Sequence, residues 1–68
     1  MNTEKVGARI KQIRLSQGIS QEKLALRADV DRTYLAGVEQ GKRNPSIKSL
    51  EKIIIALDTT FHEFFEEM

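Results

Sequence analysis

The sequence predicts an all-α fold, a single domain of five short helices within 68 residues. Three observations support this fold class. Apolar residues recur three and four positions apart along most of the chain. Residues that favour helix N-caps, or the position just after a helix, stand between those stretches. No stretch alternates apolar and polar residues with a period of two, so we expect no sheet.

The first helix is expected from about Thr3 to Gln17. Val6, Ile10 and Ile13 recur at helical spacing and form its apolar stripe. Gly18 follows at the position where a left-handed residue commonly ends a helix. The helix is therefore expected to bury one face and to end just before Gly18.

Two shorter helices follow, joined by about three residues, "DVD". Ser20 fits the N-cap of the run "QEKLALRA", whose expected buried residues are Leu24, Ala25 and Ala28. Asp31 fits the N-cap of the next helix, from Arg32 to Gln40, where Leu35 and Val38 point inward and Gly41 stops the helix.

A polar loop, "GKRNP", precedes the last two helices. Ser46 fits the N-cap of the fourth, whose expected apolar face comprises Ile47, Leu50, Ile53, Ile54 and Leu57. Thr60 and Glu63 fit a capping box for the fifth. Four apolar residues fall together there: Phe61, Phe64, Phe65 and Met68. We expect Phe61 and Phe64 to close the core.

The composition excludes several classes of protein. The chain has no cysteine and one histidine, His62, so neither a disulfide nor a thiolate or histidine-based zinc site is expected. We expect no cofactor, no small-molecule ligand and no enzyme, because no nucleophile and base, no phosphate loop and no enclosed carboxylate pair is present. The longest apolar run, "IIIAL", is too short for a membrane span, and no signal peptide is visible, which predicts a cytoplasmic protein without a membrane partner.

The net charge of +1 conceals a division between the two ends of the chain. Residues 1 to 48 hold ten Lys and Arg against five Asp and Glu, a balance of +5, and residues 49 to 68 hold one against five, a balance of −4. The first part suits a polyanion such as nucleic acid, although charged stretches are often only solvated faces.

A short helix, a three-residue turn and a second short helix match the outline of the helix-turn-helix motif. The outward face of the second member combines a long donor near its N-terminus with small residues: Arg32, Thr33, Ala36 and Gly37. A glycine inside a helix is unfavourable by about 1 kcal/mol relative to alanine. Small residues let a helix backbone approach a groove, so we expect this face to read DNA bases.

The chain resembles the lambda-repressor-like, or xenobiotic-response-element, family of helix-turn-helix regulators. The resemblance depends on "QEKLA", on a Glu before the "QG" that ends the third helix, and on "NPS" and "LEKI" taken together. Within that family, "DRTYLAGVEQGKRN" is closest to the controller proteins of restriction-modification systems, small dimers that regulate their own operon. One departure is Asp29 at a turn position usually held by glycine, and Asp tolerates a left-handed backbone.

The resemblance implies a compact five-helix lambda-repressor-like DNA-binding domain over residues 1–68. Arg32 would contact guanine and Thr33 a thymine methyl or base edge. Phosphate contacts would come from Gln21, Tyr34, Lys42, Arg43, Asn44 and Ser46. Arg14 and Glu39 would form an ion pair that braces the third helix from behind. Each residue also has a plainer interpretation, because Arg32 suits a solvated position and "GKRN" is ordinary turn chemistry.

The C-terminal end is the expected partner surface. Ile55 points away from the buried stripe of the fourth helix, and a small domain has little room for every apolar residue near its end. We assign Ile55, Phe65 and Met68 to a two-fold homodimer interface, with His62 at its rim.

The predicted function is a homodimeric transcription regulator that binds a near-palindromic site in double-stranded DNA. The alternative is a protein-interaction module, antitoxin-like or anti-repressor, that keeps the scaffold without the DNA face. The small residues on the third helix favour DNA, because protein-binding surfaces more often present aromatic anchors.

Overall fold

Five α-helices account for the regular structure in the computed structural model, which describes residues 2–66 and 68. They are α1 (Thr3–Ser16), α2 (Gln21–Ala28), α3 (Arg32–Glu39), α4 (Ile47–Ala56) and α5 (Phe61–Phe65). No strand occurs among these residues, which confirms the predicted all-α class. Within the same part of the chain, no helix is both long and apolar enough to cross a membrane.

Each helix begins at a polar N-cap whose side chain accepts a backbone N–H three residues further on. The caps are Asn2, Ser20, Asp31, Ser46 and Thr60. The last four confirm the sequence prediction. Each cap satisfies one of the N–H groups that a helix start leaves without a partner.

Left-handed residues end the helices and turn the chain. Gly18 and Gly41 have φ of 69° and 77°, after α1 and α3. Asp29 ends α2 with φ 55°, so an aspartate holds the conformation that the resembling family usually gives to glycine. Asp58, with φ 56°, does the same after α4 and was not predicted. Asp is one of the few residues with a side chain that adopts this backbone readily.

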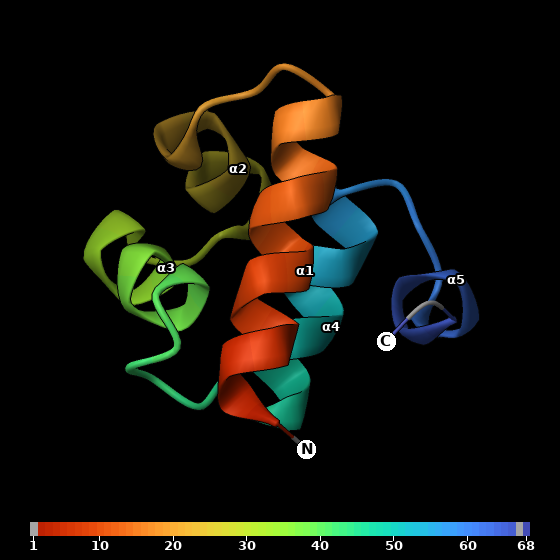
Figure 1. Cartoon of the computed structure of the whole chain (residues 1–68). Coiled ribbons are helices and arrows are strands. Elements are labelled where there is room, and N and C mark those ends of the chain that lie inside the picture. Colours follow the sequence, from red (N-terminus) through yellow and green to blue (C-terminus); the bar gives the residue numbers. More distant parts are fainter. Residues whose placement is uncertain (1, 67) are drawn as a thin grey trace.

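α1 and α4 lie together at the centre of the molecule, as Figure 1 shows, with α2 and α3 on one side and α5 on the other. α1 packs against α3, α2 packs against both α3 and α4, and α5 packs against α4. The helix pair α2 and α3 is therefore supported from behind, and its outer side stays open.

The core joins residues from all five helices. Its fully or nearly fully buried members are Val6, Ile10, Leu24, Ala25, Ala28, Leu35, Val38, Leu50, Ile53, Ile54, Leu57 and Phe64. Ile13 is only partly buried but packs against them. The buried stripes predicted for α1 to α4 are confirmed apart from one residue, described next.

Two predicted core residues are exposed. Ile47 is 70% exposed and Phe61 is 39% exposed. Each is the first residue of its helix, α4 and α5 respectively. Because helical side chains lean toward the N-terminus, a side chain in the first turn extends past the end of its helix. Phe61 instead stacks beside Phe65, with ring centroids 6.3 Å apart.

Gly7 brings α1 close to the end of α3, a contact that the sequence did not predict. The residue is buried, and a Cβ placed on it would collide with the backbone carbonyl of Val38. Backbone carbonyls cannot move aside as a flexible side chain can. Gly7 therefore sets the distance between the central helix and the second member of the helix-turn-helix pair.

Candidate nucleic-acid interface

α2 and α3 form a helix-turn-helix pair with a rigid turn. The turn covers residues 29–31, and the N–H of Val30 donates to the carbonyl of Ala25 over 3.0 Å. Ala25 is buried where the helices meet, and Leu24 and Leu35 are fully buried beside it. A small side chain and close-packed neighbours fix the angle between the two helices.

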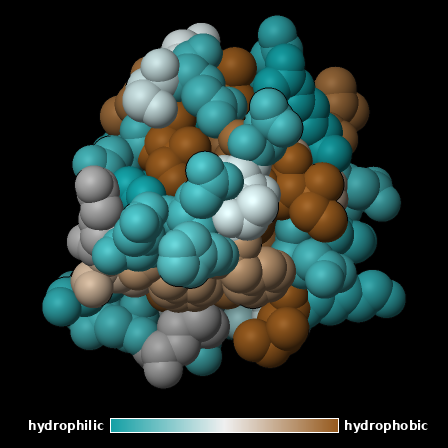
Figure 2. Space-filling view, turned by 90° about the vertical axis from the view of Figure 1, so that its right-hand side faces the viewer, coloured by the Kyte–Doolittle hydropathy of each residue, from teal (hydrophilic) through white to brown (hydrophobic). Residues whose placement is uncertain are grey.

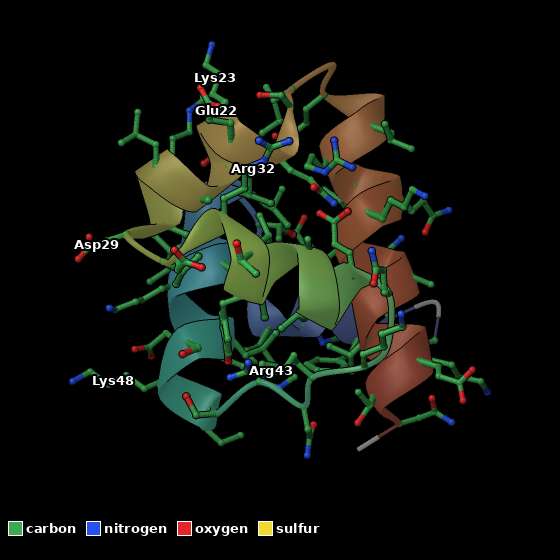
Figure 3. All side chains as sticks on the ribbon, turned by 90° about the vertical axis from the view of Figure 1, so that its left-hand side faces the viewer. Glu22, Lys23, Asp29, Arg32, Arg43 and Lys48 are labelled. Carbon is green, nitrogen blue, oxygen red and sulfur yellow. The ribbon has the colours of Figure 1, made fainter. Side chains whose placement is uncertain are left out.

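The outer face of α3 begins with two exposed polar residues, Arg32 and Thr33. Figure 3 shows Arg32 where α3 meets α2, close to Glu22. Its Nη1 lies 4.0 Å from Glu22 Oε2, and the two side chains are 64% and 79% exposed. An exposed pair at this distance contributes under about 1 kcal/mol, so the Arg32 guanidinium is available to a ligand.

The other two residues assigned to base reading are less open. Ala36 and Gly37 are half-buried. The side-chain stem of Arg43 lies over Gly37, so closely that a Cβ placed on Gly37 would collide with Arg43 Cγ. Their contact with bases stays a prediction.

The loop after α3 carries the candidate phosphate ligands. Lys42, Arg43 and Asn44 are exposed, and the Arg43 guanidinium carbon lies 5.1 Å from the centre of the Tyr34 ring. Ser46 caps α4, so the N–H groups of that helix begin directly behind the loop. Helix N-termini attract anions, which makes this end of the loop suitable for a phosphate.

Gln21 is arranged differently from its assigned role. Its Nε2 donates to Glu39 Oε1 over 3.1 Å, so the amide is directed inward in this structure. The first residue of α2 still presents its backbone N–H at a helix N-terminus. A phosphate contact from Gln21 stays a prediction, and its described contact is with the ion pair behind α3.

Arg14 and Glu39 form the predicted ion pair, and it is buried. Arg14 Nε donates to Glu39 Oε2 over 2.8 Å and Nη2 donates to Oε1 over 3.0 Å. Arg14 Nη1 also donates to the carbonyl of Ile19 over 2.9 Å. Their side chains are 8% and 1% exposed. With Gln21 included, the network ties α1, the start of α2 and the end of α3 together, so α3 is held rigidly from its inner side.

Basic side chains lie on two sides of the α3 face, and the acidic residues Glu22 and Asp29 lie near them (Figure 3). Figure 3 shows Lys23 and Arg32 on one side of α3, and Arg43 and Lys48 on the other. All four residues are exposed. Cations on two sides of an open helix favour a polyanionic ligand, as the charge division along the chain predicts.

The proposed partner surface includes α5 and lies on a side of the molecule away from α3 (Figure 1). Figure 2 shows brown and tan apolar patches on this face, broken up by teal polar surface. Ile55 is 67% exposed and Met68 is exposed as well. Phe65 is half-buried and packs edge-on against Phe64, with ring centroids 4.9 Å apart. Their place in a dimer interface stays a prediction.

A groove of about 370 Å³ lies between α1 and the last residue of the chain. It is lined by Lys5, Ala8, Arg9, Gln12 and Met68. Arg9 holds the end of α5 here, because its Nε and Nη2 donate to the carbonyls of Phe64 and Glu63 over 2.8 and 3.0 Å. The groove therefore belongs to the contact between α1 and α5 and not to the helix-turn-helix face.

These features define the class of the protein: a helix-turn-helix domain whose second helix is braced from behind and open in front. A family model described as "Helix-turn-helix" matches residues 10–64, and the chain belongs to that family. Among its relatives, control protein C.MunI of Mycoplasma sp is 41% identical over 71 aligned residues, which cover 100% of this chain and 96% of that protein.

Other relatives are also regulators. Control protein C.BamHI of Bacillus amyloliquefaciens is 50% identical over 52 residues, covering 75% of this chain and 64% of that protein. The transcriptional regulator SinR of Bacillus subtilis is 41% identical over 63 residues, covering 91% of this chain and 57% of SinR. The chain thus spans less than two thirds of these two proteins.

Solved structures agree over almost the whole chain. The restriction-modification controller protein C.Esp1396I is 45% identical with a TM-score of 0.92, over 98% of this chain and 88% of that one. The same protein has been solved as a tetramer in complex with its natural 35 base-pair operator. The controller C.AhdI of Aeromonas hydrophila is 41% identical with a TM-score of 0.88, over 93% of this chain and 96% of its own. The resemblance to controller proteins is confirmed.

Proposed function

We propose that this chain is a transcription regulator that binds a near-palindromic site in double-stranded DNA as a homodimer. It would act as a restriction-modification controller on its own operon, without catalytic activity. The observation that carries the proposal is the similarity to C.Esp1396I, which covers 98% of this chain. One of the matching structures of C.Esp1396I is its complex with operator DNA. The open face of α3, with basic side chains on two sides (Figure 3), supports it independently.

In this proposal α3 enters the major groove with its N-terminal end foremost. Arg32 is long, exposed and donates from a planar fork, which matches O6 and N7 of guanine. Thr33 beside it offers a methyl group and a hydroxyl to a neighbouring base. Lys42 and Arg43 hold the phosphates along the groove edge, where they fix orientation without reading sequence.

The buried network supplies the rigidity that this reading requires. Hydrogen bonds to bases discriminate only if the donor is held in place, because a loosely held helix accommodates a mismatched base. Arg14 holds the end of α3 through both carboxylate oxygens of Glu39. The exposed residues of α3 are thereby presented on a fixed support.

The dimer sets the geometry of the operator. A two-fold axis at the partner surface would relate two copies of α3, and both must face the same side of the duplex to enter successive major grooves about 34 Å apart. The operator is therefore expected to contain two inverted half-sites about one helical turn apart. Control would follow protein concentration, because dimer formation precedes tight binding.

A footprint on DNA just upstream of the protein's own gene tests the proposal. Two protected half-sites in inverted repeat are the expected result. Affinity should fall roughly 10³-fold or more between 50 and 200 mM salt if about six phosphates are neutralised per dimer. A flat salt response, or no retardation of any duplex, would contradict DNA binding and favour the protein-interaction alternative.

A further inference from the structure

Gly37 and the loop after α3 are joined through the backbone. The carbonyl of Gly37 accepts the N–H of Lys42 over 2.9 Å and that of Arg43 over 3.1 Å. Gly41, with φ 77°, makes the reversal between them possible. The loop thus folds directly back onto α3, and Arg43 begins beside Gly37.

The stem of Arg43 occupies the space where a side chain on Gly37 would lie. A Cβ at position 37 would be 2.6 Å from Arg43 Cγ, 3.6 Å from its Cβ and 3.7 Å from its Cδ. Gly37 lies inside α3, in a backbone conformation that alanine favours over glycine. Room for Arg43 is therefore the feature of this site that requires glycine.

The head of Arg43 is held as well. Tyr34 stands one turn before Gly37 on α3, half-buried against the core. The Arg43 guanidinium carbon lies 5.1 Å from the centre of its ring, within the range of a cation–π contact. Figure 3 shows Arg43 next to α3, on the side away from Arg32. A long and otherwise mobile side chain is thus fixed at its backbone, its stem and its head.

We propose that Gly37 is a positioning residue for DNA binding: it seats Arg43 on α3, so that the guanidinium is already oriented toward the groove edge when the duplex arrives. The DNA part of this inference rests on the proposed function. An arginine that is ordered in advance loses less rotamer freedom on binding, and affinity rises accordingly. Gly37 then acts through Arg43 and not through its own approach to the bases.

A double-mutant cycle of Gly37→Ala and Arg43→Ala tests the inference. Gly37→Ala should remain helical and unfold at the same or a higher temperature, because alanine is the better helix former. Its operator affinity should fall by about tenfold, the order expected when one long side chain must be ordered at binding. In the Arg43→Ala background the same change should have no further effect.

The cycle has clear contrary outcomes. If Gly37→Ala loses as much affinity in the Arg43→Ala background as in the wild type, Gly37 faces the DNA itself and the inference is wrong. If Gly37→Ala binds the operator more tightly, the packing against α3 holds Arg43 away from DNA, and the inference is again wrong. Arg43→Lys adds a test that leaves position 37 intact, since lysine keeps the charge but lacks the flat face. An unchanged operator affinity in Arg43→Lys would contradict a role for the contact between Arg43 and the Tyr34 ring.

A second measurement needs no DNA. In the proton NMR spectrum, the Arg43 Cγ and Cδ protons should be shifted upfield by the Tyr34 ring, the single tyrosine in a chain without tryptophan. Gly37→Ala should abolish that shift. If the chemical shifts of the Arg43 protons are normal and the wild type still binds its operator, the packing of Arg43 on Gly37 and Tyr34 is refuted but the proposed function is not. A wild type that binds no duplex refutes the proposed function, and with it the DNA role of Gly37, whatever the spectrum shows.

Discussion

Replacing Glu39 with alanine should remove a large part of the stability of the fold. The Glu39 side chain is 1% exposed and accepts three hydrogen bonds, two from Arg14 and one from Gln21. Alanine would leave the buried Arg14 charge with the Ile19 carbonyl as its remaining described partner. Breaking a buried pair from one side costs about 3 to 5 kcal/mol. A domain of this length has about 3 to 10 kcal/mol in total.

Urea denaturation followed by circular dichroism measures this loss, at one fixed protein concentration because dimerisation would add to stability. Glu22→Ala is the matched control, since Glu22 is 79% exposed and 4.0 Å from Arg32, and should change stability by less than about 0.5 kcal/mol. The double variant Arg14→Met with Glu39→Met should recover much of the loss. A Glu39→Ala variant within about 1 kcal/mol of the wild type, with an unchanged denaturant slope, would refute the reasoning.

Three further predictions concern other parts of the molecule. Arg32→Ala should weaken cognate binding by about 1 to 3 kcal/mol and random-duplex binding little, whereas Arg43→Ala should weaken both; equal losses in mobility-shift titrations on the two DNAs would remove α3 as the reading helix. Ile55→Glu, at a residue 67% exposed, should keep its helicity, sediment as a monomer and lose operator affinity, and a wild type that is monomeric well above its DNA-binding concentration would contradict this. Asp29→Val should lower the free energy of unfolding by about 1 to 2 kcal/mol while Asp29→Gly does not, because φ is 55° there; equal urea midpoints for the two would disprove it.

The helices could be predicted from sequence because their signals are local. Ser20, Asp31, Ser46 and Thr60 each cap the expected helix, and the starts of α2 and α3 match to the residue. Capping depends on one side chain and a backbone N–H three residues away, both visible in a short window. The class and family could be inferred for the same reason, since the motif is contiguous.

The spacing of apolar residues predicted burial wrongly at two helix ends, where burial depends on which other parts of the chain lie nearby. Ile47 and Phe61 have the spacing of core residues, but spacing gives the direction of a side chain and not whether a neighbour is there to cover it. Hydrogen bonds between distant residues were also missed. Gln21 bonds Glu39 across 18 positions, and Arg9 bonds the Phe64 carbonyl across 55. Neither interaction has a sequence signal at a fixed separation.

In α3, different residues support the fold and face outward, and this separation affects how such a regulator can evolve. The helix has eight residues, about two turns, too few to be stable in isolation. Its fold depends on Leu35, Val38 and Glu39 on the inner side, while Arg32 and Thr33 face outward and take almost no part in stability. The outer residues can therefore mutate freely without loss of the fold. Duplicated copies of this chain could acquire separate target sequences through a few substitutions, each copy keeping the same scaffold.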